Sequence, residues 1–139
     1  MPETESQPEF GVLDTSVVID YPRVDDAMLP DFRAISAVTL AELHAGPNAA
    51  RHDPPEQARR QQVLNWAQRI FRNPLPFDEI SAQTFGTVHL LVQESGRKPR
   101  KYLADMMIAA VAIRHRLPLY TRNPRDFEPL ASMLEVRAV

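Results

Sequence analysis

Short apolar runs alternate along this chain with longer segments in which apolar residues recur every three or four positions. The short runs predict β-strands over 10–13, 34–38, 117–121 and 134–138, with a minor strand over 75–77. The longer segments predict helices over 56–72, 79–94 and 101–116, and shorter helices near 17–22 and 40–45. Segments rich in proline, glycine and asparagine predict loops over 46–55 and 122–129.

This order of elements predicts a mostly parallel sheet with helices on both faces, which is an α/β fold. In such sheets, functional sites form beyond the carboxyl ends of the strands. Candidate chemistry should therefore lie in the residues that directly follow each strand.

Composition limits the kinds of site that this domain can hold. The 139 residues suit one domain, expected at 10–139 after a flexible N-terminal segment at 1–9. The absence of cysteine excludes disulfides and thiolate zinc sites, and the four histidines are scattered along the chain. A metal would be held mostly by oxygen, which favours magnesium, manganese or calcium.

Charge and hydropathy indicate the expected cellular location of the protein and its possible contacts. No apolar run approaches the length that crosses a membrane, and the polar N-terminus does not resemble a signal peptide, so we expect no membrane association and a cytoplasmic location. The net charge is −2, but basic residues cluster locally at 97–101 and at 122–125. These clusters are either solvated surface or contacts for a phosphate backbone.

Two acidic residues lie at or just after the ends of predicted strands, and each has an ordinary structural explanation. Asp14 directly follows the first strand and could simply be the N-cap of the next helix. Glu42 lies three residues after Thr39, the spacing of a capping box that would satisfy the first turn of a helix.

Asp105 is harder to explain by structure alone than the first two acids, and Asp126 is about as hard. Asp105 is the only polar residue in the segment LADMMIAAVAI, so its carboxylate must be paired, metal-bound or at an exposed helix start. Asp126 follows the strand at 117–121 and could cap a turn.

The four acids mean more together than separately, because the predicted fold draws Asp14, Glu42, Asp105 and Asp126 to one edge of the sheet. Two carboxylates ~4 Å apart repel by about 4 kcal/mol at an effective dielectric constant near 20. A cluster of this kind needs a divalent cation, and a cation held in this way can activate water and bind a phosphate.

Four segments of the chain resemble motifs of the PIN-domain endoribonucleases, in particular the VapC-type toxins of prokaryotic toxin–antitoxin pairs. They are LDTSVVID at 13–20, TLAEL at 39–43, DMMIAA at 105–110 and LYTRNPRDF at 119–127. They occur in the family's order, and the resemblance extends from about residue 10 to residue 139.

The resemblance implies a three-layer α/β/α sandwich that cleaves RNA with Mg²⁺ or Mn²⁺, often as a homodimer and inhibited by a cognate antitoxin. It assigns the first three acids to Asp14, Glu42 and Asp105. The variable fourth acid best matches Asp126, with Asn123 nearby. Positions 15, 16 and 121 match residues that support the acids by hydrogen bonding.

Other functional classes fit less well or remain alternatives. Haloacid-dehalogenase-like phosphatases need a second carboxylate at the position of Ser16, and response-regulator receivers need an acidic pair after the first strand and a lysine after the last. A PIN scaffold that binds RNA or a protein without catalysis is the remaining alternative, although all the expected acids are present.

Overall fold

The computed structural model describes residues 7–139, and its centre is a four-stranded sheet in the order β2-β1-β3-β4. All three pairs of neighbouring strands are parallel. The strands are short, as the sequence pattern predicts: β1 (Phe10–Leu13), β2 (Phe32–Ala34), β3 (Leu119–Thr121) and β4 (Val136–Ala138).

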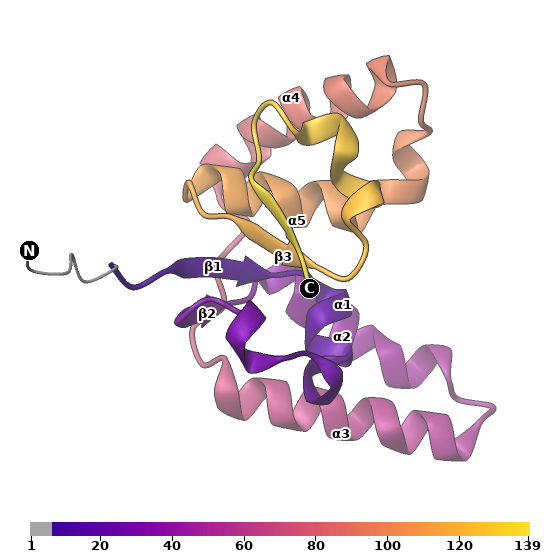
Figure 1. The fold of residues 1–139 in the computed structure, drawn as a ribbon. Helices are drawn as coiled ribbons and strands as arrows, with labels where there is room; N and C mark the ends of the chain where they lie inside the picture. Colours follow the sequence, from indigo (N-terminus) through magenta and orange to yellow (C-terminus); the bar gives the residue numbers. More distant parts are fainter. Residues whose placement is uncertain (1–6) are drawn as a thin grey trace, which may run out of the picture.

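Helices make up most of the rest of the described chain (Figure 1). The α-helices are α1 (Thr15–Ile19), α2 (Ala37–Ala49), α3 (Pro54–Ile70), α4 (Glu79–Glu94) and α5 (Leu103–Arg114). Four short 3-10 helices connect them: η1 (Tyr21–Arg23), η2 (Asp26–Met28), η3 (Pro99–Tyr102) and η4 (Pro124–Leu130).

The central strands are buried on both faces because alternate residues point to opposite sides. Val12 and Leu119 are paired in register and pack into a core formed mainly by α4 and α5. The next pair, Leu13 and Tyr120, packs into a second core with α1, α2 and α3. Figure 1 shows these two helical layers on either side of the strands, which confirms the predicted three-layer α/β/α sandwich.

The second strand lies earlier in the chain than the predicted range, 34–38. It covers Phe32–Ala34, and Ser36 is instead the N-cap of α2, its hydroxyl accepting a hydrogen bond from the Thr39 amide at 3.1 Å. The predicted minor strand at 75–77 is reduced to one bridge between Leu75 and Ser36.

The predicted loop at 46–55 is wrong at both ends, because α2 continues through Gly46 and Pro47 to Ala49 and α3 begins at Pro54, which leaves a loop only at 50–53. The last carbonyl groups of a helix lack partners within the helix. Here side chains of α3 supply them: Arg60 donates to the Gly46 carbonyl at 3.0 Å and Gln57 to the Pro47 carbonyl at 3.2 Å. The predicted loop at 122–129 likewise contains the 3-10 helix η4.

The N-terminal segment predicted to be flexible, 1–9, lies mostly outside the described residues. Within its described part, the Glu9 amide donates to Asp31 at 2.8 Å and the Glu9 carboxylate pairs with Arg137 at 2.9 Å. No helix in residues 7–139 is long and apolar enough to cross a membrane.

Candidate active site

Asp14 ends β1 and begins α1, so its buried carboxylate lies at the carboxyl edge of the sheet. It is the N-cap of α1 and accepts a hydrogen bond from the Thr15 amide at 2.8 Å. Its second oxygen accepts hydrogen bonds from the hydroxyl groups of Ser16 and Thr121, both at 2.8 Å. These three hydrogen bonds hold the carboxylate in one orientation.

Glu42 lies in the second turn of α2, and the predicted capping box with Thr39 is wrong. Because α2 begins at Ala37, Ser36 performs the capping instead. The Glu42 carboxylate accepts a 2.6 Å hydrogen bond from the hydroxyl of Thr15, the residue after Asp14. Burial raises the pKa of Glu42; the bond from Thr15 opposes this effect, and the charge of Asp14 adds to it.

Asp105 and Asp126 complete the group of acids from the other side. Asp105 lies in the first turn of α5, partly buried, and Asp126 lies in the first turn of η4. Among the described residues, no side chain or backbone amide donates a hydrogen bond to either carboxylate. Asn123, the alternative fourth residue, is exposed at the start of η4.

The structure brings the four acids within electrostatic reach of one another. The pKa of Asp105 is raised to about 7, first by burial and then by the charges of Asp14, Asp126 and Glu42. A carboxyl group with this environment binds either a proton or a cation in preference to remaining a bare charge. Perturbed acids of this kind are typical of functional sites.

These residues fit a magnesium or manganese ion, although they do not form a closed cage. Within residues 7–139, no three acidic or histidine side chains converge tightly enough to ligate one ion together. Mg²⁺ commonly keeps several waters and uses only one or two carboxylates. No described donor bonds the Asp105 or Asp126 oxygens, and three hydrogen bonds orient Asp14, so this set of oxygen donors suits a partly hydrated hard cation.

Basic residues border the acids on the side of α5 and η4. Arg97 links η4 to η3, which directly precedes α5: its guanidinium donates to the Arg125 carbonyl at 2.6 Å and lies over the Tyr102 ring. The exposed side chains of Lys98, Arg100, Lys101 and Arg125, here called the basic rim, form no ion pair with any described residue. The rim therefore places unpaired positive charge close in the sequence to Asp105 and Asp126.

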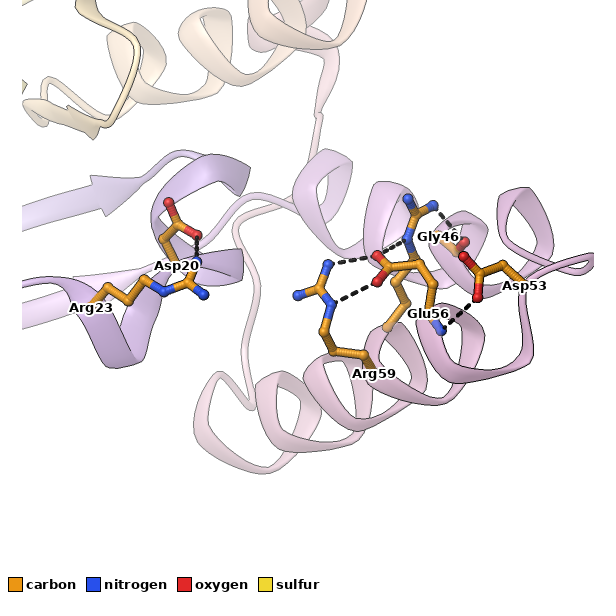
Figure 2. A network of polar contacts seen from close by, with 7 residues as sticks. Asp20, Arg23, Gly46, Asp53, Glu56 and Arg59 are labelled. Atoms are coloured by element: carbon orange, nitrogen blue, oxygen red, sulfur yellow. Dashed lines mark hydrogen bonds and ion pairs between the residues drawn. The ribbon is translucent and has the colours of Figure 1, made fainter.

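Sequence reasoning missed a polar cluster where α2 meets the start of α3 (Figure 2). Its two arginines line one pocket together with Glu42. Arg59 and Arg60 both pair with Glu56 there. The spacing from Glu56 to each arginine gave a signal for helical ion pairs. It gave no signal that α3 would bring the two arginines close to Glu42.

Comparison with known proteins identifies the fold and its family. The family model described as PIN domain matches residues 11–131, which is most of the chain. The chain belongs to the PIN-domain family. A curated relative, Ribonuclease VapC5 of Mycobacterium tuberculosis, is 35% identical over 135 residues, covering 95% of this chain and 96% of the relative.

Solved structures lead to the same family. The chain is similar to VapBC-5 of Mycobacterium tuberculosis, a member of the VapBC family of toxin–antitoxin systems, with a TM-score of 0.80 and 37% identity over 95% of this chain and 100% of that one. FitAcB of Neisseria gonorrhoeae has a TM-score of 0.68 and 26% identity over 91% and 95% of the two chains. The predicted resemblance to VapC-type PIN domains is thereby confirmed.

Proposed function

We propose that this chain is a PIN-domain endoribonuclease that hydrolyses RNA at Asp14, Glu42, Asp105 and Asp126, and that it is the toxin of a toxin–antitoxin pair. The observation that carries the proposal is the gathering of these acids at the carboxyl edge of the sheet, with Asp14 held by three donors and Asp105 by none. The VapC relatives make ribonuclease chemistry the function that fits this arrangement best.

The chain's own residues orient the reaction. Asp14 is fixed by Thr15, Ser16 and Thr121, and Glu42 is aimed by the Thr15 hydroxyl. No described donor bonds the Asp105 or Asp126 carboxylate, so their oxygens are free to bind a cation. A bound Mg²⁺ or Mn²⁺ would supply activation of water and neutralisation of charge on the phosphate.

The basic rim would position the RNA backbone. Its side chains flank Asp105 and Asp126 in the sequence, because Lys98, Arg100 and Lys101 precede α5 and Arg125 directly precedes Asp126. Contacts to phosphate are independent of sequence and supply much of the affinity for nucleic acid. They also offset the repulsion between RNA and the acids.

A protein partner has a separate surface available. A groove of about 610 Å³ between η1 and α3 contains none of the four acids. Its lining is mainly apolar or aromatic and also includes the charged residues Asp20, Arg23 and Arg59; the apolar and aromatic residues include Ile19, Tyr21, Val63 and Trp66. Exposed apolar grooves of this kind suit a helix or extended segment of another protein. We assign this groove to the antitoxin, and we expect a homodimer in the cytoplasm from the family resemblance.

Cleavage of total cellular RNA with mapped ends tests the activity. We expect cuts with Mg²⁺ or Mn²⁺, no cuts with chelator, and a loss of activity in Asp105→Asn greater than the 10- to 100-fold typical of residues that only support ligands. Asp53→Asn is the matched control, since it removes one carboxylate at the N-cap of α3, where asparagine caps equally well. RNA that is bound but never cut would support the non-catalytic scaffold instead.

A further inference from the structure

A second, smaller pocket adjoins the carboxylate cluster on the side of α2 and α3. It has a volume of about 270 Å³, and Thr15 and Glu42 form part of its wall. These two residues are joined by the 2.6 Å hydrogen bond described above, so the pocket opens directly beside the proposed site of hydrolysis. Its apolar lining comes from Ile19, Leu43 and Val63.

Two guanidinium groups complete the pocket, and one carboxylate holds both of them. Glu56 accepts hydrogen bonds from Arg59 at 2.9 and 2.6 Å and from Arg60 at 2.9 Å (Figure 2). These bonds, with the one from Arg59 first, lower the pKa of Glu56 to about 2. Arg60 is tied further to the Gly46 carbonyl at 3.0 Å, so the planar groups are ordered before any ligand arrives.

The chemistry of the pocket suits a flat, weakly charged ring better than a phosphate. Apolar side chains and the Glu42 carboxylate line the pocket, and both guanidinium groups are already paired with Glu56, so a phosphate would meet like charge and no unpaired cation. Proteins stack unpaired RNA bases on arginine guanidinium planes as well as on aromatic rings, and apolar side chains enclose the base in pockets that hold a flipped nucleotide. The volume is below that of pockets for drug-sized ligands, which begin at roughly 300 Å³.

We propose that this pocket binds one unpaired nucleobase of the RNA strand whose backbone crosses the carboxylate cluster. Arg59 and the apolar residues contact the base, and Glu56 positions the guanidinium. The proposal rests on RNA being the substrate, and it adds a base-binding site that gives the enzyme a preference for nucleotides next to the cut.

A scan of abasic nucleotides along a short, dye-labelled single-stranded RNA tests the proposal by fluorescence anisotropy, with chelator present so that the strand stays intact. For the wild-type protein, we expect one position at which removal of the base weakens binding by about 5- to 100-fold, the range for loss of one stacked base. In Arg59→Ala, and in Val63→Phe, which fills the pocket, intact and abasic strands should bind equally.

Arg69→Ala is the matched control, since it removes an exposed arginine from the last turn of the same helix, away from the pocket. It should keep the full abasic effect. The proposal is wrong if the scan is the same in all four proteins, or if Arg59→Ala and Val63→Phe impair only binding of a protein partner. Arg59→Ala changes an exposed side chain, so it remains informative if Val63→Phe folds poorly.

The outcome is separable from that of the proposed nuclease activity. If wild-type protein shows the abasic effect but never cleaves RNA with Mg²⁺, the base-binding proposal stands and the proposed nuclease activity is wrong. If the protein cleaves RNA but no position in the abasic scan affects binding, the nuclease activity stands and the base-binding proposal is wrong.

Discussion

The hydroxyl of Thr15 donates a 2.6 Å hydrogen bond to Glu42, and the backbone amide of the same threonine donates to Asp14 at 2.8 Å. One residue in the first turn of α1 therefore orients two of the four acids, which come from different elements. The Thr15 hydroxyl also contacts the Thr39 hydroxyl at 3.0 Å, within the first turn of α2.

Thr15→Val should weaken the site while keeping its shape. Valine has nearly the same volume but cannot donate to Glu42, so the carboxylate loses its orientation. We expect Mn²⁺ affinity, measured by calorimetry, and RNA cleavage to fall by about 10- to 100-fold, as for other residues that support metal ligands. Thr87→Val, on the exposed face of α4, controls for the substitution itself; equal effects in both variants would exclude a positioning role for Thr15.

Ser36→Ala should mainly lower stability, whereas Glu42→Gln should mainly lower activity. Ser36 caps α2, so its loss should lower the free energy of unfolding by about 1 kcal/mol. Glu42→Gln keeps an oxygen that accepts from Thr15 but removes the charge, so it should leave stability nearly unchanged and eliminate most cleavage. Denaturant unfolding and cleavage rates, measured on both variants, check this; full activity in Glu42→Gln would remove Glu42 from the site.

The stability of the metal-free protein should depend on Asp105 through pH. Its pKa is about 7 in the folded protein and ~3.9 in an unfolded chain, so the folded state binds this proton more tightly. The contribution of Asp105 is complete below about pH 4, falls as the pH rises, and is lost above about pH 7. Denaturant unfolding with chelator should therefore show that the free energy of unfolding falls more steeply with pH for wild type than for Asp105→Asn over this interval.

Mg²⁺ provides the second half of this test. At a pH above 7, a cation that binds only the folded state should restore stability by about 2.7 kcal/mol at a hundredfold excess over its Kd. Parallel pH profiles for wild type and Asp105→Asn, with equal responses to Mg²⁺, would contradict the assignment of Asp105.

The basic rim should be visible in the salt dependence of RNA binding. Each phosphate contact to a single strand contributes a slope of about −0.7 in a plot of log affinity against log salt concentration. Arg100→Ala combined with Lys101→Ala should therefore reduce the slope by about 1.4 and weaken binding to all sequences alike. The pair Arg51→Ala and Arg69→Ala removes the same charge from exposed positions elsewhere. A reduced slope in both pairs would mean that RNA contacts no particular basic surface.

Much of the fold could be predicted because its signals are local. The strand Phe10–Leu13 and the helix Glu79–Glu94 have the bounds that the apolar pattern indicates. The carboxyl-edge rule directed attention to Asp14, and Asp105 was conspicuous in an otherwise apolar helix. That these acids lie near one another agrees with the prediction, and their role in holding metal stays a prediction.

Other features depend on contacts that the sequence does not announce. The apolar run at 34–38 resembles a strand, but Ser36 ends it by capping α2. Gly46 and Pro47 are local helix breakers, yet α2 includes them because side chains from α3 satisfy its final carbonyls. The smaller pocket beside Glu42 takes its apolar lining from Ile19, Leu43 and Val63, which belong to three different helices and form no local pattern.

The bond from Arg97 to the Arg125 carbonyl has a mechanical consequence for the acids. Asp105 lies in α5, which follows Tyr102, and Asp126 lies in η4, which contains Arg125; the Arg97 guanidinium contacts both Tyr102 and Arg125. Arg97 and Arg125 are 28 residues apart in the sequence. We expect this contact to limit how far the starts of α5 and η4, which hold the two acids, can move apart. Because this hydrogen bond is exposed, salt and solvent conditions should then influence the spacing of Asp105 and Asp126.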